Sequence, residues 1–194
     1  MNHIESVILV VEFQKTWTEE GSFFHFLIKN EYINREIYKN SKKLLNEARR
    51  NNIKIIQSPF IIDKNNIKSY KKIPFLPKIL GQFKAGTWRA EYTDGIFKEG
   101  DYVVTGRTNF DNTINSNLTQ ILEELKVKTV YIMGFTTDHC VAETIDSLLK
   151  LGYIVILIKD ATATFKHSTQ FKMEKKYQSI SVNQLIEVIN SYKI

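Results

Sequence analysis

Short apolar runs, each followed by a stretch with helical periodicity, constrain the fold of this chain most strongly. Residues 6–12 (SVILVVE) are nearly continuously apolar and end in an acid. Such a run is typical of a strand buried on both faces of a parallel sheet, because a half-exposed strand alternates apolar and polar residues. Five further strands are predicted, the last of them short: 53–57, 101–105, 129–133, 154–158 and 179–181.

Between these runs, apolar residues recur at the spacing of one helix face. Residues 33–50 are predicted as one helix, and three more helices are expected after the third, fourth and last strands. Gly152 is expected just beyond the C-terminus of the helix that follows the fourth strand. The expected core-facing positions are Ile33, Ile37, Leu44, Leu45, Ala48, Leu118, Ile121, Leu122, Leu125, Val141, Ile145, Leu148, Leu149, Val182, Leu185, Ile186 and Ile189. The alternation predicts an α/β fold, a doubly wound, Rossmann-like three-layer sandwich with a mainly parallel sheet of about six strands.

Composition narrows the class of protein. The 194 residues are 43% hydrophobic and contain no Gly/Ser/Pro-rich linker, so one domain spanning residues 1–194 is expected. No apolar run approaches the roughly 18 residues of a membrane span, and no basic segment precedes an apolar leader at the N-terminus. Together with a cysteine count of one, this favours a cytoplasmic protein without a membrane partner.

The charge pattern argues against a nucleic-acid-binding protein, and the pattern of metal-ligating residues argues against a metalloprotein. The net charge is +6, but the lysines are interspersed with acidic residues and Asn, which is typical of solvated helix faces rather than of a nucleic-acid surface. The four histidines are scattered, and no CxxC or HExxH motif occurs. We therefore expect no nucleic-acid partner, no metal and no other cofactor.

The lone cysteine, Cys140, lies where the hydrophobic period changes from that of a strand to that of a helix. Gly134 is expected to end the fourth strand, and Thr137 and Asp138 are both suitable N-cap residues. Cys140 would then occupy the first helical turn, where free N–H groups and the helix dipole favour an anion. The pKa of its thiol is therefore expected to lie below the reference value of about 8.5.

Two charged residues follow other predicted strands. Glu12 ends the first strand and Arg107 follows the third. Because the carboxyl ends of parallel strands share one edge of the sheet, these side chains and Cys140 are expected to converge there as a nucleophilic site. The irregular stretch 60–100 is expected to cover this site, with Phe83 and Trp88 either as lid contacts or as a small satellite core.

Several motifs resemble those of the isochorismatase-like cysteine hydrolases, a family that includes nicotinamidases and related amidohydrolases. The resemblance covers nearly the whole chain. Residues 134–141 (GFTTDHCV) resemble the family's Gly-x-x-Thr-Asp-x-Cys-Val motif, and Asp160-Ala161 resembles its later Asp-Ala pair. Glu12-Phe13-Gln14 with Trp17 resembles the family's Asp-x-Gln followed by an aromatic residue. Residues 83–91 and 106–111 resemble the segments that precede and contain its catalytic lysine.

The resemblance implies an Asp-Lys-Cys triad that hydrolyses a C–N bond of a small amide or imide through a covalent thioester. Position by position, Cys140 is the nucleophile, Glu12 takes the aspartate place and Arg107 takes the lysine place. The backbone N–H groups of Thr136 and Cys140 would form the oxyanion hole around a cis Phe135–Thr136 peptide bond. Aromatic residues would line the substrate pocket: Phe13, Trp17, Trp88 and Phe135. Family members commonly associate, so a homo-oligomer is expected.

The two triad substitutions keep alternatives open. Glu in place of Asp moves the carboxylate by one methylene, and a displacement of about 1 Å can cost on the order of 100-fold in rate. Arg107 retains the positive charge but cannot give up a proton, as a lysine can. One alternative is a weakly active or inactive relative that binds a small molecule, and another is a hydrolase of isochorismate-type vinyl ethers. The Asp-x-His metal motif of nicotinamidases has no counterpart after Gln57, which disfavours that activity.

Overall fold

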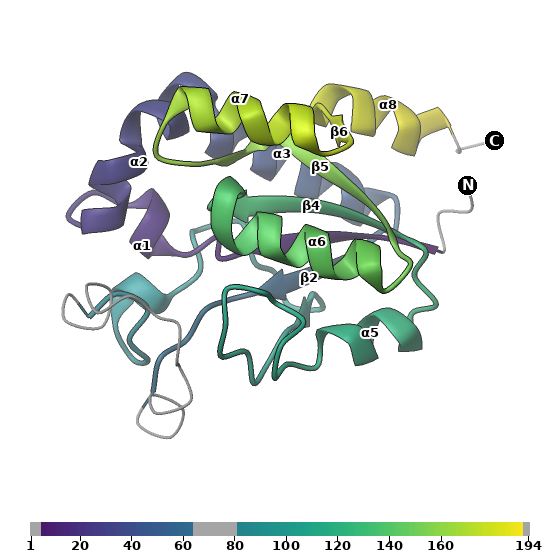
Figure 1. The fold of residues 1–194 in the computed structure, drawn as a ribbon, viewed down its shortest axis with the longest axis horizontal. Coiled ribbons are helices and arrows are strands. Elements are labelled where there is room, and N and C mark those ends of the chain that lie inside the picture. The colour runs from purple at the N-terminus through teal and green to yellow at the C-terminus, as the bar shows by residue number, and fades with distance from the viewer. Residues whose placement is uncertain (1–4, 64–80, 192–194) are drawn as a thin grey trace.

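The computed structural model describes residues 5–63 and 81–191. Within these ranges six strands form one sheet in the order β3-β2-β1-β4-β5-β6, and each neighbouring pair is parallel (Figure 1). The strands are β1 (Ser6–Val11), β2 (Lys54–Ser58), β3 (Tyr102–Val103), β4 (Thr129–Phe135), β5 (Ile154–Ala163) and β6 (Ser179–Ile180). The predicted doubly wound α/β sandwich is confirmed.

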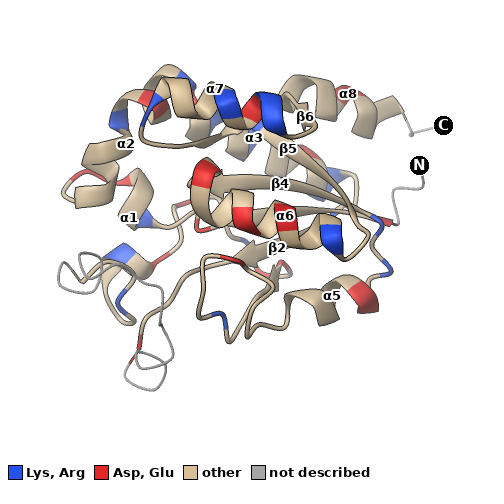
Figure 2. Cartoon of the chain, viewed as in Figure 1, with Lys and Arg blue, Asp and Glu red and all other residues tan. Residues whose placement is uncertain are grey.

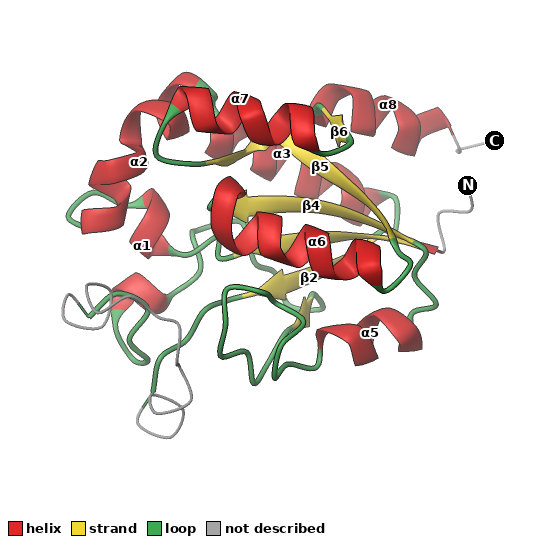
Figure 3. Ribbon diagram, in the orientation of Figure 1, coloured by secondary structure: helices red, strands yellow, loops and turns green. Residues whose placement is uncertain are grey.

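Helices cover both faces of the sheet (Figure 3). They are α1 (Lys15–Thr18), α2 (Phe23–Asn34), α3 (Ile37–Arg50), α5 (Leu118–Glu124), α6 (Ala142–Lys150), α7 (His167–Lys176) and α8 (Val182–Ser191). Ile8 and Val10 of β1 pack in one core with α3 and α8, whereas Val7 and Leu9 pack in a second core with α5 and α6. Successive strand residues point to opposite faces, so β1 must be apolar throughout.

The helix predicted over residues 33–50 is two helices. Glu36 lies between α2 and α3 with φ of 50°, in the left-handed region that interrupts a right-handed helix. The side chain of Arg35 at this junction forms an ion pair with Glu174 of α7. Ile33, predicted to face the core, is 56% exposed because it belongs to the last turn of α2 and not to the apolar face of α3. Leu149 of α6 is likewise exposed.

Gly134 does not end β4, as the sequence suggested, because the strand continues through Phe135. Its φ is +118°, and a Cβ atom built on it would lie 1.9 Å from the carbonyl oxygen of Val11. Glycine is therefore required because β4 approaches the end of β1 closely. The same approach brings the segment after β4 next to the residue that follows β1.

Other strand boundaries also differ from the prediction. The third strand is shorter than residues 101–105, which agrees with the edge position of β3, and β5 extends five residues beyond 158. Residues 64–80, including Pro74 and Pro77 of the predicted covering loop, lie outside the described residues. The described part of that loop contains a short 3-10 helix, η2 (Trp88–Ala90). Phe83 is buried and belongs to the main core, so it is not a lid contact.

Charged residues of both signs occur together on α6 and α7 (Figure 2). Lys176 of α7 pairs with Asp146 of α6 at 3.1 Å, and both side chains are about half exposed. Such pairs leave a solvated surface of mixed charge. In the described ranges, no helix combines the length and the apolar character needed to cross a bilayer.

Candidate active site

The carboxyl edge of the sheet carries the candidate site at the point where the strand order reverses. β1 and β4 are neighbours, but their connections lead to opposite sides of the sheet, and ligands of open α/β sheets bind at such a point. Glu12 directly follows β1. Its φ is 52°, and its backbone N–H donates to the carbonyl oxygen of Ser58 at 3.0 Å. A non-glycine residue held in the left-handed region is often part of a functional site.

Arg107 and Glu12 form a buried ion pair across 95 positions of sequence. Nη2 of Arg107 lies 2.5 Å from Oε1 of Glu12, and each side chain is only 2% exposed. The guanidinium also donates to the backbone carbonyl oxygens of Ser58, Asn109 and Phe110. It lies over the ring of Phe60 as well, 4.8 Å from the centroid. Arg107 is therefore held by the protein on several sides.

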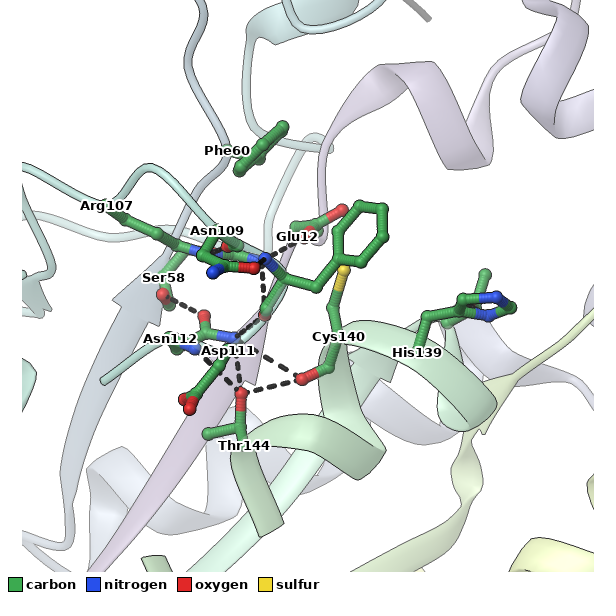
Figure 4. Close-up of polar contacts among 12 residues, drawn as sticks. Glu12, Ser58, Phe60, Arg107, Asn109, Asp111, Asn112, His139, Cys140 and Thr144 are labelled. Carbon is green, nitrogen blue, oxygen red and sulfur yellow. Dashed lines mark hydrogen bonds and ion pairs between the residues drawn. The ribbon is translucent and has the colours of Figure 1, made fainter. Parts of the chain in front are cut away.

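Cys140 lies in a short π-helical turn, η3 (Thr137–Val141), which directly precedes α6. Its sulfur is directed toward Glu12, as the close-up shows (Figure 4). The structure therefore brings Glu12, Arg107 and Cys140 together, as their positions after strands β1, β3 and β4 predicted.

The prediction that Cys140 ionises readily is wrong. Burial raises the pKa of its thiol well above the ordinary value, and the nearby negative charge of Glu12 raises it further. The charge of Arg107 lowers this pKa but does not offset the other two effects. Position in a helical turn does not decide the state of this thiol, because burial disfavours the charged thiolate. At neutral pH the group is a thiol, with the side chain of Glu12 beside it.

A cluster of hydrogen-bonded polar side chains connects the loop that contains Arg107 to the turn that contains Cys140. Asn112 donates to the hydroxyl oxygen of Thr144 at 2.6 Å, and Thr144 donates to the carbonyl oxygen of Cys140 at 2.6 Å. The hydroxyl of Ser58 donates to the side-chain oxygen of Asn112. All three residues are fully buried. Sequence reasoning missed them, although Thr144 lies four residues after Cys140 and therefore on the same helix face.

Trp17 contacts the same carboxylate from another direction. Its indole Nε1–H donates to Oε2 of Glu12 at 3.3 Å. The ring is 4% exposed and lies in helix α1. It stacks on Phe24 and Phe135, with centroid distances of 4.6 and 5.8 Å. The indole is therefore fixed in orientation by its neighbours.

The other aromatic candidates fall into two groups. Phe13 and Phe135 are fully buried in the main core, and their ring centroids lie 4.9 Å apart. Trp88 is 40% exposed, lies beside the guanidinium of Arg89, and lines a shallow hollow with Lys15. The Phe135–Thr136 peptide bond is cis, which confirms the expected backbone geometry.

A cavity of about 420 Å³ lies beside Arg107. It is bounded by residues at the ends of β2 and β3 and by the segment after η2: Pro59, Ile61, Asp63, Ala90, Tyr92, Val103, Val104, Thr105, Gly106 and Arg107. Burial raises the pKa of Tyr92 to about 12, so its hydroxyl is neutral at ordinary pH. The cavity is large enough for a small molecule.

His139 and Asp138 form a more exposed pair next to the thiol. Nδ1 of His139 lies 3.1 Å from Oδ1 of Asp138, and the imidazole side chain is 50% exposed. A hydrogen bond to Asp138 raises the pKa of His139. Burial opposes a low pKa for Asp138, but hydrogen bonds from His139 and Thr164 still lower it. His139 points away from Glu12 (Figure 4), so this pair does not face the sulfur.

Metal-binding side chains do not gather at this edge. Across residues 5–63 and 81–191, no three His, Cys, Asp or Glu side chains lie close enough to hold one ion.

Comparison with solved structures identifies the same architecture in other proteins. A cysteine hydrolase from Pseudomonas syringae pv. phaseolicola superposes with a TM-score of 0.84 and 18% identity, covering 98% of this chain and 95% of that one. N-carbamoylsarcosine amidase from Thermoplasma acidophilum superposes with a TM-score of 0.69 and 19% identity, covering 92% and 97%. At this level of identity the likeness concerns the fold.

Sequence comparison extends over a similar length. Ureidoacrylate amidohydrolase RutB of Agrobacterium fabrum is 22% identical over 209 aligned positions, covering 96% of this chain and 90% of that protein. The model of the isochorismatase domain matches residues 6–188, which include all six strands and the three convergent side chains. The chain therefore belongs to the isochorismatase family of hydrolases.

Proposed function

We propose that this protein is a cysteine hydrolase that cleaves a C–N bond of a small amide, imide or ureido compound through a thioester on Cys140. One observation carries the proposal: the buried thiol lies beside a carboxylate that is itself paired with a buried arginine. A thiol next to a general base is the usual arrangement for an activated nucleophile. The amidohydrolase and amidase among the similar proteins support the same class of reaction.

The raised pKa of Cys140 determines how the reaction begins. Because the group is a thiol at rest, its proton must leave as the sulfur attacks the carbonyl carbon of the substrate. Glu12 accepts that proton. The C–N bond then breaks, and Glu12 returns the proton to the departing nitrogen. Water attacks the thioester with Glu12 again as base, which releases the acid product and restores the thiol.

Arg107 and the backbone stabilise negative charge in this scheme. The guanidinium stays protonated throughout, so it holds Glu12 in place and does not transfer protons. Backbone N–H groups of Thr136 and Cys140 serve as the oxyanion hole for the tetrahedral intermediate. The aromatic side chains of Trp17, Phe13, Phe135 and Trp88 remain the proposed substrate-binding set.

A burst experiment tests the proposal. Small amides, imides, ureido and N-carbamoyl compounds are mixed in excess with the enzyme, and the protein mass is followed during the first turnover. Cys140 is the sole cysteine, so a thioester adduct can form only there. The adduct should appear with the good substrate and be absent in Cys140→Ser. Turnover that persists in Cys140→Ser would contradict the proposed mechanism and would favour vinyl ether hydrolysis, to be checked with isochorismate.

The enclosed ion pair favours a second candidate function, a binding protein with little activity. Glu12 and Arg107 form an ion pair with each other, and Cys140 beside them is only 5% exposed. The double variant Glu12→Asp, Arg107→Lys restores the family's usual pair and separates the two functions. Hydrolysis that appears only in the double variant would favour the binding protein, whereas turnover by the natural chain would exclude a role in binding alone.

A further inference from the structure

Glu12 receives a second hydrogen bond that the family triad does not account for. Arg107 pairs with Oε1 of its carboxylate, and the indole N–H of Trp17 donates a hydrogen bond to Oε2. A glutamate has one more rotatable bond than an aspartate, so its carboxylate needs more restraint to keep one orientation. Donors on both oxygens supply that restraint. The sulfur of Cys140 is directed toward Glu12 (Figure 4).

The surroundings of Trp17 fix where its N–H can point. Phe24 and Phe135 stack on its ring, and Phe83 lies at 6.0 Å between centroids. With 4% of its surface exposed, the indole has no room to turn. The hydrogen bond to Glu12 is thus set by packing in the core, and a side chain of the same shape without the N–H would pack similarly but donate nothing.

We infer that Trp17 is a positioning residue: its indole N–H holds the Glu12 carboxylate beside Cys140. This inference rests on the proposed role of Glu12 as the base of the hydrolysis. It assigns Trp17 a task separate from contact with substrate. The indole acts on the sulfur only through Glu12, so every effect of removing the N–H should disappear when Glu12 carries no charge.

The direction of the effect follows from electrostatics. The negative charge of Glu12 raises the pKa of Cys140, and a donor on that carboxylate offsets part of the charge. Without the indole N–H, the carboxylate would hold the thiol proton more strongly. Less thiolate would then be present at a given pH, and alkylation of Cys140 would be slower.

A shape-matched replacement tests the inference without creating a cavity. Trp17 is replaced by 3-benzothienylalanine, in which sulfur takes the place of the indole N–H, and the rate of reaction with iodoacetamide is measured across pH. At neutral pH we expect about a tenfold slower reaction, with the whole profile displaced to higher pH. With a substrate in hand, kcat should fall more than KM rises. An unchanged alkylation profile would overturn the inference.

Two further variants separate positioning from packing. In a Glu12→Gln background the same replacement should have no effect on alkylation, because the group through which Trp17 acts is gone. Equal effects in both backgrounds would overturn the inference. Leu45→Ala is the packing control: it opens a cavity in the same core but leaves the rings stacked on Trp17 in place, so it should lower the melting temperature without displacing the pH profile. Since alkylation needs no substrate, a failed search for turnover would count against the proposed function and leave this result standing.

Discussion

The substitution Glu12→Gln separates the two effects of this residue on Cys140. Gln has nearly the same shape and keeps an oxygen that can accept from Arg107, but it has no charge and is not a base. The negative charge that raises the pKa of Cys140 disappears, and the opposing charge of Arg107 remains. We therefore expect the pKa of Cys140 to fall, so the thiol becomes easier to alkylate while hydrolysis is lost.

The structure also sets the cost in stability. The Arg107 side chain is 2% exposed and would lose its ion pair with Glu12. Leaving a buried charge uncompensated costs about 3–5 kcal/mol. The carbonyl oxygens of Ser58, Asn109 and Phe110 and the ring of Phe60 stay in place, so the lower end, about 3 kcal/mol, is expected. For a chain of this length that corresponds to a melting temperature lower by about 6–12 °C.

Three measurements on one preparation test the reasoning. Urea unfolding gives the stability change, iodoacetamide labelling gives the reactivity of the thiol, and turnover of the substrate found in the burst experiment gives activity. Turnover should fall by about 10²–10⁴-fold, the range in which general bases act. The matched control is Asp101→Asn, which breaks the largely buried pair with Arg49 and should cost stability without changing Cys140 labelling.

Two results would refute the reasoning. Turnover retained in Glu12→Gln would show that Glu12 is not the proton acceptor, and slower labelling would show that its charge does not oppose ionisation of Cys140.

Three further predictions concern other parts of the molecule. Gly134→Ala should destabilise the fold by more than about 4 kcal/mol in urea unfolding, because its Cβ would collide with the carbonyl oxygen of Val11; a loss below about 1 kcal/mol would contradict the close approach. Phe26 is 74% exposed on α2, and we expect it at the contact between subunits of the predicted homo-oligomer. Phe26→Glu should therefore reduce the particle mass measured by light scattering. A natural chain that is monomeric would refute this prediction. His139→Gln should lower the free energy of unfolding by about 0.5 kcal/mol or less, since the imidazole side chain is half exposed. Because the pKa of His139 is raised and that of Asp138 is lowered, both groups are charged between about pH 4 and pH 6.5, and the full loss of stability is expected there. The loss should decrease as the pH rises through the pKa of His139 or falls through the pKa of Asp138. A loss that does not depend on pH would exclude the charged pair.

Much of the fold was predictable because burial leaves a local record in the sequence. The apolar run of β1 and the helical stripes of α3 and α8 follow from the two faces that each must bury. The split between α2 and α3 was not predictable in the same way. It depends on the left-handed conformation of Glu36 and on the pairing of Arg35 with Glu174, which lies 139 positions away.

The candidate site was likewise predictable only in part. The places of Glu12, Arg107 and Cys140 after their strands predicted that they would meet. The hydrogen bond from Trp17 to Glu12 has no local signature, since it depends on how α1 packs against Phe24 and Phe135. A tryptophan near an acid in sequence is as compatible with a pocket wall as with a donor.

The sequence by itself determined the layers, the parallel strands and the edge at which chemistry-bearing residues gather, because these depend on residue type and period along the chain. The tertiary structure decided the state of Cys140. A thiol at a helical turn was expected to ionise easily, but its pKa is raised because packing removes water and brings the charge of Glu12 beside it. Desolvation and charge pairing depend on distances between residues remote in sequence, and only the folded chain fixes those distances.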